Sequence, residues 1–323
     1  MSLDLRWNRV VQRAMLALAC NVGFACGDDA EISPPAVDAG TRDAEAPKAG
    51  KGGGGGSSGQ ADRQSVTISF RAAVADRDFS CLERYENVGA TKTGARPVDF
   101  RFYVQDLALI DADGEEVPVA LETRAPWQTA DVALIDFEDR KGSCKGTPET
   151  NLTITGKVPA GEYTGVVFTN GVPEALNHLD QSKQPPPLDV TELYWAWLSG
   201  YRFMVAELAQ DAEPAPAADE DAGIVQPGIG LMHIGSTSCG KNDGCKKKNR
   251  NRVRLTDFKP DSDVIVADIG AIFGDTDVAQ DMQCHSADEI CAPMFERLGV
   301  DFAKGESNEA QKVFRVAAAG AGR

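Results

Sequence analysis

Residues 98–110 carry the clearest structural signal in the chain: they read Val-Asp-Phe-Arg-Phe-Tyr-Val-Gln-Asp-Leu-Ala-Leu-Ile. Apolar and polar side chains alternate through its first half, and aromatic and β-branched residues are frequent, as in a strand with one face in a core. The turn-forming residues Asp111-Ala112-Asp113-Gly114 follow, and Val117–Leu121 has the composition of a returning strand. The region therefore predicts an antiparallel β-hairpin.

Similar segments recur along the chain, each bounded by turn residues. They are Ser65–Val74, Val132–Phe137, Leu152–Val158, Thr164–Thr169, Tyr201–Leu208, Ile229–Ile234, Arg252–Leu255, Val264–Ile269 and Val313–Val316. Many short strands with regular turns predict an all-β sandwich with long loops. Helix signals are few, and we expect only short helical turns at Leu193–Trp197 and Ala292–Leu298. The acidic segment Gln210–Ala222 predicts a solvated loop.

The N-terminus has the features of an export signal. Basic residues precede Ala14–Ala25, a mostly apolar run that is too short to span a bilayer. The sequence Ala25-Cys26-Gly27 then resembles a lipoprotein cleavage site, which predicts a signal peptide over residues 1–25 and lipidation of Cys26. Cys20 is a rival lipidation site, and ordinary secretion is the alternative. We expect a periplasmic or outer-membrane/cell-surface protein whose lipid is its sole membrane attachment.

Composition divides the remainder of the chain. Residues 26–64 are rich in Ala, Asp, Pro and Gly and predict a disordered tether, because they cannot bury enough apolar surface to offset the entropy of ordering. Residues 65–317 predict the folded β domain, and 318–323 a flexible tail. The chain has 33 Lys and Arg against 49 Asp and Glu, a formal net charge of −16. This balance argues against nucleic acid as a partner.

Six cysteines follow the signal: Cys81, Cys144, Cys239, Cys245, Cys284 and Cys291. An even number in an exported chain predicts disulfides. The last four form two closely spaced pairs, each of which can close a local bridge, and this leaves Cys81 for Cys144. Other pairings are open, and so is a thiolate metal site, although no CxxC spacing typical of zinc is present.

Histidine and tryptophan are scarce, with three and four residues respectively. His178 follows a loop sequence, and His233 lies in a short strand pattern on the face opposite Met232 and Ile234. Neutral imidazole is a good ligand for copper or zinc. His285 lies between Cys284 and Cys291 and is a weaker candidate. Each of these histidines is otherwise a structural hydrogen-bonding group, and the tryptophans are otherwise core or ligand-facing aromatics.

The sequence resembles the MbnP family of exported proteins linked to copper handling. Matching runs, in order, are Asp99–Val104, Trp127-Gln128, Val132–Glu138, Gly171-Val172-Pro173, Leu176-Asn177-His178, Tyr194–Phe203, His233–Cys239, Val266–Ile269 and Cys291–Phe295. The resemblance implies a β-rich, disulfide-bonded fold. It also implies copper binding that depends on a tryptophan converted to kynurenine by a MauG-like di-haem cytochrome, MbnH.

The resemblance nominates His178 and His233 as copper ligands. Among the tryptophans we favour Trp127 as the modified residue, because it is isolated at a strand entrance, with Trp195 and Trp197 as rivals. An intact indole is a poor ligand because its N–H is only a donor. No motif of an independent catalyst is present, so we expect a non-enzymatic copper protein. The alternative is a non-catalytic β-sandwich lipoprotein that binds a ligand or another protein.

Overall fold

The computed structural model describes residues 62–196, 198–210, 229–241, 244–280 and 282–320. The predicted signal peptide, Cys26, nearly all of the tether, Trp197 and most of the acidic segment Gln210–Ala222 lie outside these residues. The predicted domain bounds, 65 and 317, fall inside the first and last strands that the structure describes, Arg63–Val74 and Phe314–Ala318.

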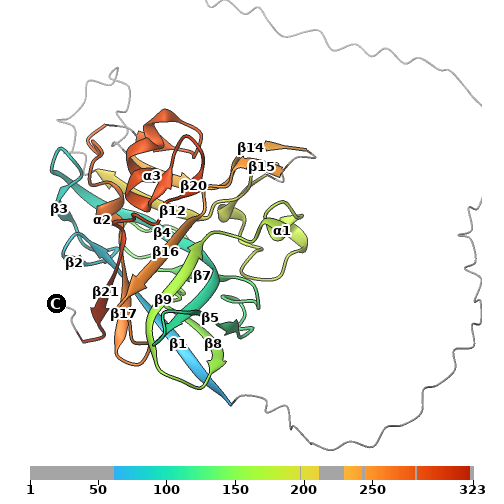
Figure 1. The fold of residues 1–323 in the computed structure, drawn as a ribbon. Helices are drawn as coiled ribbons and strands as arrows, with labels where there is room; N and C mark the ends of the chain where they lie inside the picture. Colours follow the sequence, from blue (N-terminus) through green and yellow to red (C-terminus); the bar gives the residue numbers. More distant parts are fainter. Residues whose placement is uncertain (1–61, 197, 211–228, 242–243, 281, 321–323) are drawn as a thin grey trace, which may run out of the picture. The chain divides into compact units, whose positions relative to one another are not determined.

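A long strand, β4 (Thr93–Asp111), organises the larger of two main sheets (Figure 1). The sheet has nine strands in the order β16-β9-β4-β12-β13-β18, and β3, β5 and β7 also pair with β4. Their bounds are β3 (Tyr85–Val88), β5 (Glu116–Pro118), β7 (Ala133–Asp136), β9 (Tyr163–Asn170), β12 (Met204–Gln210), β13 (Ile229–Ile234), β16 (Asn251–Thr256) and β18 (Met282–Cys284). The predicted hairpin is confirmed, since β4 and β5 pair antiparallel.

The second sheet has six strands in the order β21-β17-β1-β8-β6, with β2 paired to β1. Its members are β1 (Arg63–Val74), β2 (Arg77–Asp78), β6 (Ala120–Leu121), β8 (Thr153–Pro159), β17 (Asp263–Asp268) and β21 (Phe314–Ala318). Most pairs are antiparallel, but β1 with β17 and β13 with β18 are parallel. These two long-range pairings could not be read from the strand patterns alone.

Aromatic side chains join the two sheets into a sandwich. Phe70 and Phe314 belong to the six-stranded sheet, and Phe102 and Phe168 to the nine-stranded one. Their rings meet edge to face across the interface, with centroid distances of 5.9 Å for Phe70–Phe102 and 5.3 Å for Phe168–Phe314. All four are buried. Burying one such side chain contributes about 1.5–3 kcal/mol, so this contact fixes the sheets against each other and confirms the predicted fold class.

Helices are short and lie outside the sheets. They are α1 (Glu174–Asn177), α2 (Ile269–Ile272) and α3 (Ala292–Leu298), with 3₁₀ turns at Gln181–Lys183 (η1), Thr191–Leu193 (η2) and Glu289–Cys291 (η3). The predicted turn at Ala292–Leu298 is confirmed as α3. The turn predicted at Leu193–Trp197 is wrong beyond Leu193, because Tyr194–Ala196 forms β10 and pairs with β11 (Gly200–Tyr201). No helix in the described ranges is long and apolar enough to cross a membrane.

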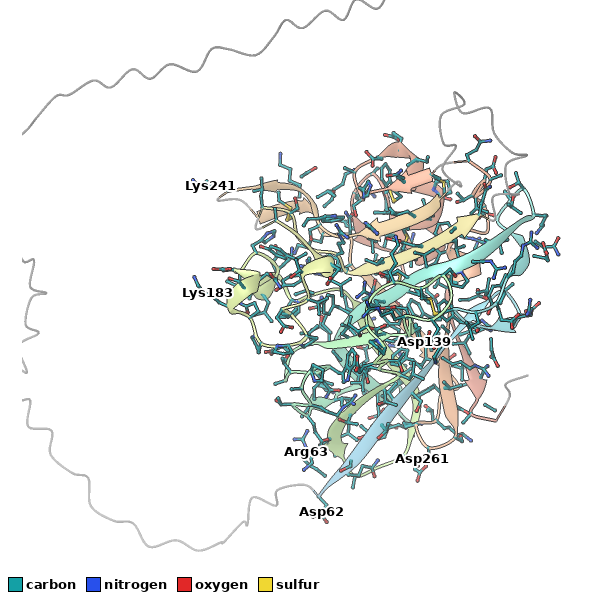
Figure 2. All side chains as sticks on the ribbon, turned by 180° about the vertical axis from the view of Figure 1, so that it is seen from behind. Asp62, Arg63, Asp139, Lys183, Lys241 and Asp261 are labelled. Carbon is teal, nitrogen blue, oxygen red and sulfur yellow. A yellow bond between two sulfur atoms is a disulfide. The ribbon has the colours of Figure 1, made fainter. Side chains whose placement is uncertain are left out.

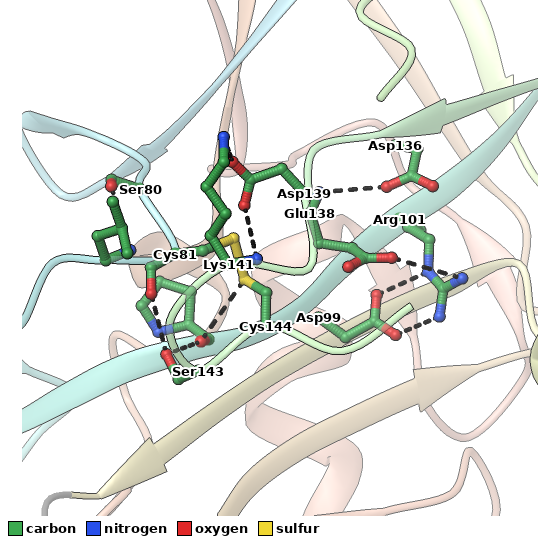
Figure 3. The surroundings of a disulfide bond; sticks show 12 residues. Ser80, Cys81, Asp99, Arg101, Asp136, Glu138, Asp139, Lys141, Ser143 and Cys144 are labelled. Atoms are coloured by element: carbon green, nitrogen blue, oxygen red, sulfur yellow. Dashed lines mark hydrogen bonds and ion pairs between the residues drawn. A yellow bond between two sulfur atoms is a disulfide. The ribbon is translucent and has the colours of Figure 1, made fainter. Parts of the chain in front are cut away.

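Three disulfides have the predicted connectivity: Cys81–Cys144, Cys239–Cys245 and Cys284–Cys291. The first joins residues 63 apart in sequence and anchors two loops beside β4 (Figure 3). The second crosslinks the hairpin of β14 (Thr237–Gly240) and β15 (Gly244–Lys247), where Cys239 and Cys245 are cross-strand partners. The third joins the end of β18 to η3.

Candidate metal centre

Scarce metal-binding and aromatic residues gather at one end of the sandwich. Helix α1, which precedes His178, and the β14–β15 hairpin lie at this end in Figure 1. Figure 2 shows Lys183 and Lys241 there, while Asp62, Arg63 and Asp261 lie at the opposite end. The first described residue, Asp62, is therefore remote from this cluster.

His233 is the most buried of the histidines, with 4% of its surface exposed. It lies on β13 opposite Val205 of β12, and Met232 and Ile234 on the other face are fully buried in the core. This confirms the predicted alternation. Nε2 of the ring lies 2.7 Å from Glu207 Oε1 on β12, whereas Nδ1 is buried and has no hydrogen-bond partner among the described residues.

Glu207 determines the tautomer of His233. Burial raises the pKa of this carboxyl, but the hydrogen bond with His233 and the charges of His233, Lys145 and Arg202 leave it below its ordinary value. An ionised carboxylate only accepts hydrogen bonds, so Nε2 must carry a proton and donate it. In the neutral form of a ring with this tautomer, the lone pair is on Nδ1. A carboxylate that orients an imidazole in this way is the usual outer partner of a metal-binding histidine.

His285 lies beside His233, with ring centroids 5.3 Å apart. Burial, together with the charges of His233 and Arg202, lowers the pKa of His285. A neutral imidazole is the form that binds metals. The sequence ranked this residue low because it lies between two bonded cysteines. The parallel pairing of β18 with β13 brings His285 close to His233. The local sequence pattern did not predict this pairing.

His178 has different described neighbours. Its Nε2 lies 3.1 Å from Asn177 Nδ2 and 3.2 Å from Cys245 Sγ. Asn177 Oδ1 accepts a hydrogen bond from the Tyr201 backbone, which leaves its amide group to donate to His178. His178, Cys239 and Cys245 thus form a His/Cys group whose potential ligand atoms lie within 4.8 Å of one another. Since both sulfurs are bonded together, this group is not a thiolate metal site as it stands.

Trp195, on β10, packs against the strand end that carries His233. A Cβ placed on Gly235 would lie 2.6 Å from a ring carbon of Trp195 and 2.5 Å from the Tyr201 carbonyl. Only glycine permits this approach, two residues beyond His233. The guanidinium of Arg202 lies over the Trp195 ring, 5.6 Å from its centroid. Because Tyr201 also binds Asn177, the β10–β11 hairpin links the neighbourhoods of Trp195, His178 and His233.

Comparisons with known proteins show the family of this chain. The family model that matches is MbnP, over residues 63–286, which is more than half of the chain. This chain belongs to the MbnP family. The solved structure of MbnP from Methylosinus trichosporium matches with a TM-score of 0.70 at 28% identity, covering 80% of this chain and 99% of that chain. Comparison with curated proteins finds no match. The fold implied by the sequence resemblance is thereby confirmed.

In this member of the MbnP family, Trp127 lies in a different setting. It is half-buried and lines a cavity of about 300 Å³ together with Arg101, Leu134, Asp136 and acidic loop residues. No histidine is among the cavity's described lining residues. Trp195 is half-buried as well, so exposure does not distinguish the two tryptophans. Their neighbours do, since only Trp195 is shown packing beside a histidine strand.

A stripe of buried charged residues crosses the nine-stranded sheet on the face opposite the apolar core. Strand register places Asp136 of β7 opposite Arg101 of β4, and Glu207 of β12 opposite Asp99 of β4. Asp99 accepts two hydrogen bonds from the Arg101 guanidinium, and Glu138 Oε1 lies 3.9 Å from Nη1 of the same guanidinium (Figure 3). The stripe therefore extends from the Trp127 cavity to the Glu207–His233 pair.

Proposed function

We propose that this MbnP-family protein binds copper, that His233 and His178 provide imidazole ligands, and that oxidation of Trp195 to kynurenine completes the site. The single observation that carries the proposal is the buried, unpartnered Nδ1 of His233. A buried nitrogen without a hydrogen bond costs about 1–3 kcal/mol. A fold that keeps one, with Glu207 holding the other ring nitrogen, is adapted to a ligand at Nδ1.

The donor set suits a soft or borderline metal ion. Imidazole nitrogens are favourable ligands for copper, and the described cluster holds no free carboxylate of the kind that calcium or magnesium requires. A copper ion held by His233 and His178 would place a positive charge at this end of the sandwich. Glu207 would hold the proton of His233 Nε2, and the Arg202–Trp195 contact would keep the aromatic ring against Gly235.

The tryptophan must change before it can contribute a donor, since the indole N–H has no lone pair in the ring plane. Cleavage of the indole C2–C3 bond inserts two oxygen atoms, which dioxygen or two equivalents of peroxide can supply. Hydrolysis then releases formate and leaves an aryl amine and a ketone. We propose that a di-haem MauG/MbnH-like cytochrome performs this oxidation. In this proposal the MbnP-family protein is a copper carrier and not an enzyme. It acts as a lipid-anchored protein in the periplasm or at the cell surface.

The first test is peptide mapping by mass spectrometry after co-expression with the di-haem cytochrome. We expect the peptide containing Trp195 to gain one oxygen and lose one carbon atom, with fragmentation assigning the change to Trp195 and not Trp197. Trp127 should remain intact. Modification of Trp127 alone, or of no tryptophan, would refute the assignment. Protein expressed without the cytochrome provides the unmodified control.

The second test is copper titration of the matured protein. His233→Ala should abolish tight binding, and Glu207→Gln should weaken it roughly 10- to 100-fold, as losses of such outer partners do. Titration of His285→Ala tests whether the neighbouring imidazole is also a copper ligand. Trp127→Phe is the matched control and should leave the copper affinity unchanged. Wild-type affinity in both the His233 and His178 alanine variants would exclude the site.

A further inference from the structure

The cavity beside Trp127 has the features of a second ligand site, separate from the histidine cluster. It measures about 300 Å³, which is at the lower limit of ordinary small-ligand pockets. Trp127, Pro126, Leu134 and Val190 provide its apolar wall. A half-buried tryptophan facing such a space is available to stack on a bound group.

Carboxylates surround the opening of this cavity. Glu149, Asp189 and Glu192 line it and are exposed. Within the described part of the chain, none of the three forms an ion pair. Glu192 is attracted by Arg202 at longer range, and the carboxylates of Glu149 and Asp189 have no salt-bridge partner in the described residues. The basic residue in the wall, Arg101, is already engaged by Asp99 and lies near Glu138.

Asp136 forms the inner part of the cavity wall. It is 2% exposed, and its Oδ1 accepts a hydrogen bond from the Glu138 backbone (Figure 3). No described group bonds to its other oxygen, and Asp136 is among the residues that line the cavity. Burial raises the pKa of Asp136 to about 8 against the opposing effect of Arg101. A cation beside this carboxyl would offset the cost of ionising it.

We propose that this cavity binds an alkylguanidinium group, which stacks on Trp127, contacts Asp136 and is attracted by Glu149, Asp189 and Glu192. Guanidinium is planar and delocalised, stacks on aromatic faces and matches a carboxylate with two parallel hydrogen bonds. The apolar wall accommodates its aliphatic stem. Such a group occurs on free guanidino compounds and on arginine side chains of protein partners, and both present the same chemistry to the cavity.

Isothermal titration calorimetry of the full chain with two probes tests the proposal. Agmatine represents the free compound, and a capped Gly-Gly-Arg-Gly-Gly peptide represents a protein side chain. Both should bind, the tighter one indicating the natural source, while the same peptide with neutral citrulline should not. Absence of binding by agmatine and by the arginine peptide overturns the proposal, and so does equal binding of the citrulline peptide.

Variants locate the binding. Glu149→Gln, Asp189→Asn and Glu192→Gln together should weaken it about tenfold at low salt, and the control Asp113→Asn, Glu115→Gln and Glu289→Gln removes the same charge from exposed residues elsewhere. Trp127→Leu should also weaken binding about tenfold, because it removes the cation–π contact with the guanidinium. If the leucine variant does not fold, Trp127→Phe replaces it in the test. Phenylalanine retains an aromatic face, so this variant should still bind the guanidinium probes. Unchanged affinity in both the acidic triple variant and Trp127→Leu refutes the site.

The result does not depend on the copper proposal. The probes contain no metal, and the variants leave His178, His233 and Glu207 in place. Copper binding without guanidinium binding removes this inference alone. Guanidinium binding without copper binding removes only the proposed function.

Discussion

Replacing Asp136 with asparagine should stabilise the protein, and the gain should grow as the pH rises. The pKa of this buried carboxyl is raised from 3.8 to about 8, so the folded chain retains a proton that the unfolded chain releases above about pH 4. The folded state binds more protons, and stability therefore falls with rising pH across this interval. The slope approaches about 1.4 kcal/mol per pH unit. Between pH 5 and pH 8, the loss attributable to Asp136 is about 3–4 kcal/mol.

Asparagine retains an oxygen that can accept from the Glu138 backbone but has no proton to lose. Urea denaturation of the oxidised protein at pH 5, 6.5 and 8 measures the difference in unfolding free energy between variant and wild type. That difference should increase by about 3–4 kcal/mol from pH 5 to pH 8. The control is Asp113→Asn, a change of the same kind at an exposed turn residue. An equal effect of Asp136→Asn at pH 5 and pH 8 would show that the folded protein does not hold this proton.

Two further predictions concern the disulfides and the three lysines that follow Cys245, Lys246–Lys248. Removing Cys81–Cys144 by paired alanine substitution should lower the unfolding free energy by about 4 kcal/mol, and removing Cys239–Cys245 should lower it by about 2 kcal/mol. The difference arises because the first disulfide closes a loop of 63 residues and the second a loop of 6. Urea titration of the two variants compares these losses, and equal losses would contradict the loop-length argument. We also expect Lys246 and Lys248, which are exposed, to attract an acidic surface of the di-haem cytochrome, whereas Lys247 is held by the Phe302 carbonyl and ring. Reversing Lys246 and Lys248 to Glu should slow tryptophan oxidation at low salt but not near physiological salt, where the screening length is about 8 Å. An unchanged rate at low salt would show that these two lysines are ordinary solvated residues with no role in docking.

Strand positions were predictable because each local pattern reports which face of the chain is buried. Phe100 and Phe102 alternate with Asp99 and Arg101, and the structure buries the phenylalanines in the core and pairs the charged residues on the other face. The helical turn predicted at Leu193–Trp197 was wrong for a physical reason. Tyr194 and Trp195 form a strand because Gly200 and Tyr201 fold back to pair with them, and this partner is not part of the local pattern.

The candidate site was predictable only in part. The sequence singled out His178, His233 and the tryptophans because these residue types are scarce and have metal or redox chemistry. It ranked Trp127 first on the basis of accessibility, which the two half-buried tryptophans share. The contact between Trp195 and Gly235 was not visible, and neither was the approach of His285 to His233. Each depends on strands that pair across long stretches of chain.

The sequence by itself determined the all-β class and the alternation that buries one face of each strand, because both follow from local periodicity. It also favoured the two local disulfides, whose cysteines lie 6 and 7 residues apart, whereas the Cys81–Cys144 pairing across 63 residues was open until the structure was known. The tertiary structure alone decided which polar groups meet. Pairing of β12 with β13 places Glu207 against His233 Nε2, and parallel pairing of β13 with β18 brings His285 to the same ring. Pairing of β4 with β7 puts Asp136 beside Arg101. These are contacts between residues distant in sequence, and their energies depend on burial, which exists only once the two sheets have packed.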